Sequence, residues 1–435
     1  MVRQAVLLNQ TYSPAPGWSR LAGLPLLLRA VLTAQRAGIE EILIVGGQDP
    51  QSLLARDRRV QVVWRWVPLE SSEADSEIKA LERVAPELKE NFIVFFSDSI
   101  FDAAALNFLQ GVSLDGRLAV VGLAPGRTDG FEQASLYVCT PEFVRQAGQA
   151  EAPAGRPQRL GEAAARLRER GVEVLEIPGR VWPRTSERKR LRAILWELSR
   201  VNLKPSDGFY ARFNKLYLAQ PLIRLFLRTP ATPNFITGLG LVLGLAAGVV
   251  FAHGGYWWSV LGASLWFLSA LMDHADGMVA RLKFMESEFG TWFESWVDYI
   301  STFSAYIGLT IGLYRETGFA HHLVVGGLFV FGAIMIFITQ SQQRKRLSPD
   351  NPADYPNRMH RKLEEHSSNL FLWFARKAYF VARRAVLPYW MLFFCLLDLR
   401  VLFVGWSALG AHLMWIFTLY SNRHIRPEAP PAPAD

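Results

Sequence analysis

The sequence predicts two folding units, an α/β head with a parallel sheet and an all-α domain of six transmembrane helices. Its 435 residues exceed the size of one ordinary domain. Charged, Ala-rich and Pro-rich sequence fills the first half, whereas aromatic residues and long apolar runs gather after about position 230. We therefore expect a head over residues 1–200, a juxtamembrane amphipathic helix over 201–230, the membrane domain over 231–423 and a disordered tail over 424–435.

The head is predicted from short β-branched runs that alternate with helical stretches, the pattern of a parallel α/β sheet. Its expected strands are, in chain order, AVLL, EEILIVGG, VQVVWRWV, NFIVFFSD, LAVVGLA and VEVLEIPG, with PLLLRAVLTAQRAG as the first helix. The opening apolar run, Ala5–Leu8, is too short for a signal peptide, so we expect the head to stay in the cytosol. The two cysteines, Cys139 and Cys395, lie in different halves, which argues against a disulfide framework.

The membrane domain is predicted from apolar segments near the ~20 residues that a bilayer requires. Before them, FNKLYLAQPLIRLFLRTP mixes apolar residues with Lys215, Arg224 and Arg228, which is typical of an amphipathic helix on the inner membrane surface. The six candidate spans are roughly 234–252, 256–280, 291–313, 321–340, 378–397 and 401–420.

Charges in the loops predict how these spans are oriented. The loop after the fourth span is rich in Arg and Lys, whereas the turns on the opposite side, HGGY, YRETGFAHH and DLR, are nearly uncharged. By the positive-inside rule, we expect a multi-pass protein of the cell inner membrane with both termini in the cytosol. Many basic residues of this chain, whose net charge is +8, flank apolar spans, so membrane lipids and phosphorylated substrates are better partners than nucleic acid.

Within the second and third spans, the segment LMDHADGMVARLKFMESEFGTWFESWVDYIS places four carboxylates, Asp273, Asp276, Glu294 and Asp298, in or beside hydrocarbon. Asp273 and Asp276 share one helical face, while Glu294 and Asp298 share another with Gly290. Burying carboxylates in hydrocarbon is costly unless cations compensate, and oxygen ligands favour hard ions such as Mg²⁺ or Mn²⁺. The alternatives are membrane-interface charges, or a proton relay of the kind that transporters use.

Small residues and an arginine accompany the acids. Gly277 follows the second acid and Gly290 precedes the third by one turn, so a ligand has room beside both helix backbones. Arg281 lies one turn beyond Gly277, near the cytosolic end of the helix, where its guanidinium can bind a phosphate. The expected occupant is therefore an anionic diphosphate held between metal ions and Arg281.

This segment resembles the motif of the CDP-alcohol phosphotransferase family, D-x2-D-G-x2-A-R-x8-G-x3-D-x3-D, with every spacing kept. Glu294 stands where the family has its third aspartate, so a carboxylate is kept but is one methylene longer. The matching residues are Asp273, Asp276, Gly277, Ala280, Arg281, Gly290 and Asp298.

The resemblance implies a six-helix membrane domain, usually dimeric, with two divalent metal ions. It implies a CDP-alcohol donor, a phosphorylated polyol or lipid acceptor, and CMP as a product. By residue, it implies that Asp273, Asp276 and Glu294 bind metal and that Asp298 is a metal contact and the general base near the acceptor. The implied nucleotide site includes Asp273, Gly277, Ala280, Arg281 and Gly290.

Two elements before the first span resemble the subgroup that makes di-inositol phosphates and related products. Pro233, Asn234 and Thr237 match a P-N-x-x-T feature at the cytosolic mouth, which implies that Asn234 and Thr237 contact the nucleotide. A turn and helix cap is the alternative for these two residues. A D-G-F-x-x-R element is matched by Asp207, Gly208, Phe209 and Arg212.

Three arginines are candidates for binding an acceptor phosphate: Arg212, Arg383 and Arg384. Arg383 and Arg384 fall about six residues inside the fifth span, where exposure to lipid is costly and a functional role is the default hypothesis. Snorkelling to the inner interface is the alternative for this pair.

The head, through RLAGLPLLLRAVLTAQRAGIEEILIVGG and FFSDSIFD, resembles sugar-nucleotide nucleotidyltransferases, which implies a Rossmann-like fold. That family has a Gly-rich phosphate loop, a lysine before Pro-Leu-Leu and metal-binding aspartates. Here NQTYSPAPGWSR stands for the loop and Leu24 for the lysine. Asp98 keeps one metal position, unless it is a turn residue, and Pro183, Arg184 or Thr185 replaces the second acid. We expect a degenerate head that docks a partner cytidylyltransferase, binds nucleotide or holds the dimer.

Three functions are open at this point. The first is condensation of CDP-inositol with inositol 1-phosphate, because such a head fused to such a membrane domain resembles the bifunctional inositol-phosphate cytidylyltransferases and di-inositol-phosphate-phosphate synthases. The second is phospholipid synthesis from CDP-diacylglycerol or a CDP-archaeol-like donor, which would use the same motif. The third is a non-enzymatic membrane scaffold, for which Glu294 in place of aspartate is the one hint.

Overall fold

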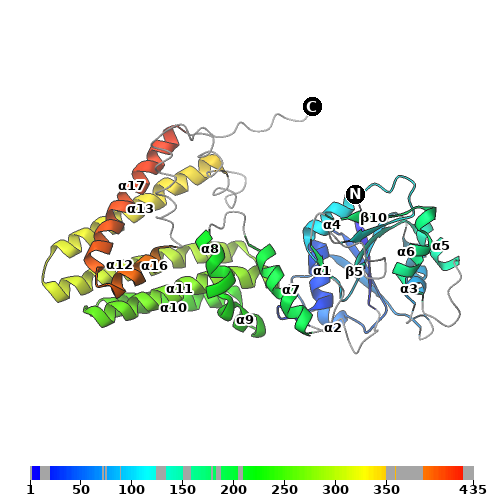
Figure 1. The fold of residues 1–435 in the computed structure, drawn as a ribbon, viewed down its shortest axis with the longest axis horizontal. Helices are drawn as coiled ribbons and strands as arrows, with labels where there is room; N and C mark the ends of the chain where they lie inside the picture. Colours follow the sequence, from blue (N-terminus) through cyan, green and yellow to red (C-terminus); the bar gives the residue numbers. More distant parts are fainter. Residues whose placement is uncertain are drawn as a thin grey trace. The chain divides into compact units, whose positions relative to one another are not determined.

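The chain divides into two compact units, Met1–Leu198 and Ser199–Asp435 (Figure 1). The first is an α/β unit and the second is helical, which confirms the predicted fold class. The computed structural model describes residues 2–9, 20–70, 73, 76–88, 90–123, 134–149, 158–177, 180–182, 188–203, 209–348, 358 and 386–424.

A seven-stranded sheet forms the centre of the head, in the order β10-β8-β9-β6-β1-β4-β5. The pairs of β1 with β4 and β6, of β4 with β5 and of β8 with β10 are parallel. β9 is antiparallel to β6 and β8, so the sheet, predicted as parallel, is mixed at this strand. β9 is a four-residue run, too short to be recognised from periodicity. The strands are β1 Gln4–Leu8, β4 Glu41–Val45, β5 Val63–Val67, β6 Phe92–Phe96, β8 Ala119–Leu123, β9 Leu136–Cys139 and β10 Val172–Glu176.

Helices cover both faces of this sheet. Figure 1 shows α1 and α4 on one face and α3, α5 and α6 on the other, so central strands such as β6 are buried on both sides and read as unbroken apolar runs. Two small antiparallel ladders join β2 Arg20–Leu21 to β3 Leu24–Pro25 and β7 Ile100–Phe101 to β11 Val181–Trp182. The helices are α1 Leu26–Arg36, α2 Gln51–Leu54, α3 Glu77–Val84, α4 Ala103–Gln110, α5 Pro141–Gln149, α6 Leu160–Arg166 and α7 Arg188–Val201, with 3-10 turns at Ala85–Glu87 and Arg168–Arg170.

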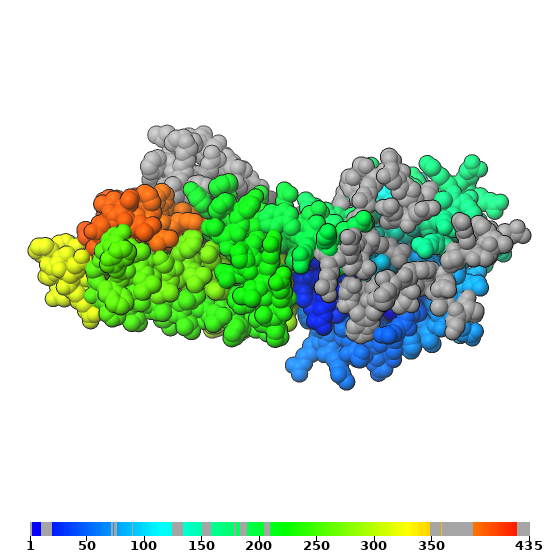
Figure 2. Space-filling view, turned by 60° about the horizontal axis from the view of Figure 1, so that its bottom comes forward, coloured from blue at the N-terminus to red at the C-terminus, as the bar shows by residue number. Residues whose placement is uncertain are grey.

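The second unit is built from long helices preceded by a short helical segment. That segment consists of α8 Phe209–Phe213, a π-helical stretch Asn214–Leu218 and α9 Gln220–Arg228. The long helices α10 to α12 pack together and form one continuous surface, green to lime in Figure 2. The remaining helices are α10 Pro233–Phe251, α11 Tyr256–Lys283, α12 Glu288–Thr317, α13 His321–Leu347, α16 Leu387–Leu396 and α17 Arg400–His424.

Three of these helices are long and apolar enough to cross a membrane: α10, α13 and α17. α11 and α12 are longer, with 28 and 30 residues, but both carry charged residues. α16 has ten residues, and most of the predicted fifth span before it lies outside the described residues. Six spans and the orientation of the termini therefore stay predictions, while a membrane domain is supported.

Exposed tryptophans also support a membrane domain. Trp257 and Trp258, at the start of α11, are 78% and 46% exposed. Trp292 and Trp296, near the start of α12, are 56% and 47% exposed. Because α12 follows α11 after a short turn, the two pairs belong to opposite ends of adjacent helices. This is where membrane proteins place aromatic residues, at the two lipid–water interfaces.

Glycines allow α10 and α12 to pack backbone against backbone. A Cβ atom added at Gly308 would lie 2.0 Å from the carbonyl oxygen of Gly248, and one at Gly244 would lie 2.3 Å from Oγ of Ser301. Any larger residue at these positions would force the helices apart. This close packing sets the distance between the first span and the acids of α12.

A buried arginine joins the start of α11, the end of α12 and the start of α17. Arg400, whose side chain is 7% exposed, donates to both carboxylate oxygens of Glu316, at 2.8 and 3.1 Å, and to Oγ of Ser259 at 3.0 Å. It also contacts Asp398 at 2.6 Å. Residues from α11, α12 and the start of α17 are thereby held at one point.

Candidate functional site

Three of the four predicted acids, Asp273, Asp276 and Asp298, line a cavity of ≈ 250 Å³ between α10, α11 and α12, which we call the acid pocket. Asp273 and Asp276 enter from α11 and Asp298 enters from α12, as the helical spacing of the motif predicts. The pocket is lined by Thr237, Gly240, Trp266, Ser269, Ala270, Asp273, His274, Asp276, Val297, Asp298, Ser301, Thr302 and Pro388.

Asp276 is the most deeply placed of the acids, with 2% of its surface exposed. Its Oδ2 lies 2.5 Å from the hydroxyl oxygen of Thr237, which donates to it. Its other oxygen, Oδ1, is buried with no hydrogen-bond partner. Buried carboxylate oxygens are rarely left without a donor or a cation, so this atom marks a place where a positively charged ligand fits.

Thr237 and Asn234 lie in the first turns of α10, and neither is its cap. The cap is Thr232, whose hydroxyl accepts from the backbone N–H of Phe235 at 3.3 Å, so the capping alternative is wrong for the two residues. The side-chain oxygen of Asn234 would lie 3.2 Å from a Cβ added at Gly290. Asn234 therefore approaches the backbone of α12 at the motif glycine.

Glu294 is half-buried on α12 and does not line the acid pocket. Its charge is nevertheless close enough to act on Asp276, as is that of Asp273. Among the described residues, no three acidic, histidine or cysteine side chains converge closely enough to form a ready-made metal cage.

The arginine of the motif folds back along its own helix. Nη1 of Arg281 would lie 3.4 Å from a Cβ added at Gly277, so the guanidinium covers this glycine. A bulky residue at position 277 would displace it. Arg281 and Ala280 end the same face of α11 that carries Asp273 and Asp276.

Lys283 fixes the segment that leads into α10 against the end of α11. The residue is 5% exposed, and its Nζ donates to the carbonyl oxygens of Phe226, Thr229 and Ala231 at 2.9, 2.9 and 3.1 Å. All three ammonium protons have partners. Because the chain enters α10 at residue 233, this anchor helps to place Thr237 beside Asp276.

Sequence reasoning missed several residues of the acid pocket. Nδ1 of His274 lies 3.5 Å from Asp273, and Oγ of Ser269 donates to the carbonyl of Gly240 at 2.7 Å. Thr302 lies one helical turn after Asp298, so its place could have been inferred from spacing. Pro388 comes from α16, far away in sequence, and only the tertiary structure brings it here.

Of the three predicted phosphate-binding arginines, Arg212 lies within the described residues. Arg212 lies in α8 and is exposed, as is Phe209 of the same element. Arg383 and Arg384 lie outside the described residues, and so do Asp207 and Gly208.

In the head, Leu24 is 6% exposed and lies in β3, so an apolar side chain is buried where the resembling family has its lysine. Asp98 lies in the turn after β6, at the carboxyl end of a central strand, and is half-buried. An arginine that the sequence did not single out, Arg29 of α1, is buried, and its burial together with the charges of Arg36 and Arg59 lowers its pKa to about 9. The loop 10–19 and residues 183–185 lie outside the described residues.

Comparison with known proteins agrees with this geometry. Residues 230–415 match the CDP-alcohol phosphatidyltransferase family. The chain is 23% identical over 344 residues to the bifunctional IPC transferase and DIPP synthase of Aquifex aeolicus, which covers 73% of this chain and 76% of that protein. It is 33% identical over 98 residues to the archaetidylinositol phosphate synthase of Methanothermobacter thermautotrophicus, which covers 21% of this chain and 49% of that protein.

Among solved structures, the inositol-1-phosphate CTP transferase from T. maritima is similar, with a TM-score of 0.36 and 15% identity over 45% of this chain and 95% of that one. The match to the membrane family covers the helices that build the acid pocket. Residues 230–415 therefore form a CDP-alcohol phosphatidyltransferase domain, and the chain that carries it is a phosphotransferase.

Proposed function

We propose that this enzyme transfers a phospho-alcohol from a CDP-alcohol to an acceptor hydroxyl in the acid pocket and releases CMP. The observation that carries this proposal is Asp276, whose buried Oδ1 has no donor in a pocket that also contains Asp273 and Asp298. Three carboxylates around one cavity would repel each other and any phosphate unless a cation entered with the substrate.

The residues fit Mg²⁺ or Mn²⁺, and we propose a site for two ions held by Asp273, Asp276, Glu294 and Asp298. The donor atoms are all oxygen, which hard divalent ions prefer. Bound there, the ions would neutralise the charge of the diphosphate and of the departing CMP.

The protein groups then divide the chemistry. Asp298 accepts the proton of the attacking hydroxyl, whose oxygen forms a bond to the phosphorus that carries the alcohol. The bond from that phosphorus to the oxygen of CMP breaks, and the electron pair leaves with CMP. Thr237 holds the carboxylate of Asp276 in place, and Arg281, with Asn234 and the motif glycines, contacts the nucleotide phosphates.

For the substrates, we propose CDP-inositol as donor and inositol 1-phosphate as acceptor, with Arg212, Arg383 and Arg384 as the acceptor's phosphate ligands. The name of the Aquifex relative supports this choice, because the match covers most of this chain and most of that protein. A lipid donor such as CDP-diacylglycerol is the second candidate. It is favoured by the name of the archaetidylinositol phosphate synthase, a relative at higher identity over a shorter stretch.

For the head, we propose that it no longer transfers nucleotides. The buried Leu24 supports this, because an apolar core side chain cannot replace a lysine that binds phosphate. We further propose that the enzyme is a homodimer, that both termini face the cytosol, and that the head docks a partner cytidylyltransferase.

The test is product analysis with radiolabelled CDP-inositol and CDP-diacylglycerol in parallel, each with inositol 1-phosphate and Mg²⁺. We expect CMP release from CDP-inositol that requires the acceptor. CMP release from CDP-diacylglycerol and not from CDP-inositol would instead indicate phospholipid synthesis. Release from neither donor would refute the proposal and favour a scaffold.

A further inference from the structure

Ser301 of α12 is a buried serine in the wall of the acid pocket. The residue is 4% exposed, and its hydroxyl oxygen has no hydrogen-bond partner among the described residues. Nothing in the sequence pattern singled it out. A serine hydroxyl can donate one hydrogen bond and accept two, and burying it unpaired costs free energy. The hydroxyl of Ser301 is therefore available to a molecule bound in the pocket.

Two other hydroxyls of the acid pocket are already engaged within the protein. Thr237 donates to the carboxylate of Asp276, and Ser269 donates to the carbonyl oxygen of Gly240 at 2.7 Å. Of these three hydroxyls, that of Ser301 is the one that can bind a ligand without breaking a bond inside the protein.

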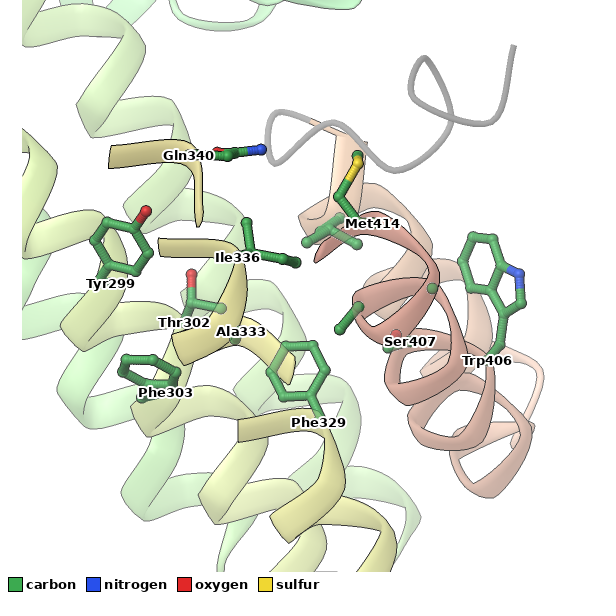
Figure 3. Close-up of a pocket in the computed structure, with 13 residues that line it drawn as sticks. Tyr299, Thr302, Phe303, Phe329, Ala333, Ile336, Gln340, Trp406, Ser407 and Met414 are labelled. Carbon is green, nitrogen blue, oxygen red and sulfur yellow. The ribbon is translucent and has the colours of Figure 1, made fainter. Parts of the chain in front are cut away.

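The polar part of the acid pocket ends next to Ser301. The following residue, Thr302, lines the pocket but also lines a second, mostly apolar cavity of ≈ 310 Å³ between α12, α13, α16 and α17. Figure 3 shows Thr302 with Phe303 and Ala333 in the wall of this apolar cavity. The hydroxyl groups of a bound substrate therefore belong on the side of Asp298 and Ser301, not beyond Thr302.

Asp298, which takes the acceptor's proton in the proposed function, lies three residues before Ser301 on α12. Cβ atoms at this spacing are about 5–6 Å apart, so two neighbouring hydroxyls of one molecule can reach both side chains. The attacking hydroxyl gives its proton to Asp298 and its lone pair to phosphorus. A serine that donated to the same oxygen would make it a weaker nucleophile, so Ser301 fits a neighbouring hydroxyl that does not react.

We infer that Ser301 is a specificity residue that forms a hydrogen bond with a second hydroxyl of the acceptor, next to the one that attacks. The inference rests on the proposed function, which places the acceptor beside Asp298. It goes further, because it requires an acceptor with hydroxyls on adjacent carbons, as inositol 1-phosphate has. An acceptor that lacks the second hydroxyl leaves Ser301 buried and unpaired, so the enzyme uses it less efficiently.

The variant that tests this contact is Ser301→Ala, which removes the hydroxyl and keeps the side chain small. Small size matters because a Cβ added at Gly244 of α10 would clash with the Oγ of Ser301. Ser304→Ala is the matched control, since Ser304 meets Gly248 of α10 in the same way but does not line the acid pocket. Lost packing would therefore affect both variants, whereas a lost substrate contact would affect Ser301→Ala alone.

Two measurements are made on the full chain in detergent. The first is kcat and KM for CMP release from CDP-inositol, with inositol 1-phosphate or with its monodeoxy analogues, each of which lacks one ring hydroxyl. The second, which needs no turnover, is calorimetric binding of the same acceptors in the presence of Mg²⁺ and CMP. Size-exclusion profiles identify any variant that fails to fold.

With the native enzyme, we expect one analogue to bind about tenfold more weakly than inositol 1-phosphate and to have a kcat/KM about tenfold lower, the effect of one neutral hydrogen bond. Ser301→Ala should lower kcat/KM for inositol 1-phosphate by a similar factor. It should also no longer distinguish that analogue from inositol 1-phosphate, in turnover or in binding. Ser304→Ala should keep the native preference.

Other outcomes separate the two proposals. If inositol 1-phosphate supports CMP release and Ser301→Ala keeps the native preference among the analogues, the inference is overturned and the proposed function stands. Equal losses in Ser301→Ala and Ser304→Ala with every acceptor would also overturn the inference, in favour of helix packing. Binding of inositol 1-phosphate that weakens in Ser301→Ala, without CMP release from any donor, would refute the proposed function and keep Ser301 as a contact for the polyol. Neither binding nor CMP release would refute both.

Discussion

Thr237→Val removes one hydroxyl from the acid pocket and keeps the shape of the side chain. In the native protein this hydroxyl lies 2.5 Å from Oδ2 of Asp276. Because Oδ1 already has no hydrogen-bond partner, the variant leaves this 2% exposed carboxylate without any side-chain donor. The side chain is then free to rotate away from the position in which it binds an ion.

The expected magnitude follows from two independent estimates. A hydrogen bond to a charged group contributes about 1.5–3 kcal/mol. Loss of a residue that orients a metal ligand costs about 10–100-fold in metal affinity or activity, which is about 1.4–2.7 kcal/mol. Both estimates predict that Thr237→Val raises the half-saturating Mg²⁺ concentration by about 10–100-fold.

The assay is a Mg²⁺ titration of CMP release, with direct Mn²⁺ binding measured by electron paramagnetic resonance. Thr237→Ser is the control, since it keeps the hydroxyl and should stay within about threefold of the native protein. If Thr237→Val and the native protein gave the same titration curves, Asp276 would not be a metal ligand held by Thr237.

Four further predictions follow from the same structure. Asp273→Asn or Asp276→Asn should abolish CMP release in protein that stays folded in detergent, because ion binding rather than core packing is lost; more than about a tenth of native activity would contradict this. Glu294→Gln should raise the half-saturating metal concentration by about tenfold, and Glu294→Asp should give a titration curve that differs from those of the native protein and of Glu294→Gln. Superimposable metal titrations of the three proteins would show that Glu294 is not a metal ligand. The full chain, given CTP, Mg²⁺ and inositol 1-phosphate, should release no pyrophosphate above background, and robust release in a coupled assay would mean that the head is active. Arg400→Met should lower the free energy of unfolding by about 2 kcal/mol, which is less than for a fully buried ion pair because Glu316 is 35% exposed. The thermal unfolding midpoint should fall by several degrees, while the dependence of activity on metal stays native.

The acid motif could be predicted from sequence because a helix converts spacing into direction. Residues three or four apart share a face, so Asp273 and Asp276 had to point the same way once α11 was recognised. The partner of Asp276 could not be predicted with the same ease. Thr237 is 39 residues away, and its contact depends on the close packing of α10 and on the anchor that Lys283 provides.

The head illustrates the same limit in a sheet. Long apolar runs such as Phe92–Phe96 are easily recognised as strands, because strands buried on both faces are apolar throughout. The direction of β9 cannot be predicted in this way, because a run of four residues does not indicate which strands it will pair with.

By itself, the sequence determined the two units, the acid motif and the reaction class, because each depends on local composition or on spacing along one helix. Only the tertiary structure decided that Thr302 would line both the acid pocket and a second, mostly apolar cavity between α12, α13, α16 and α17. A cavity is space left over when side chains from distant segments pack, and its size depends on all of them at once. No pattern along the chain therefore indicates where such a cavity forms.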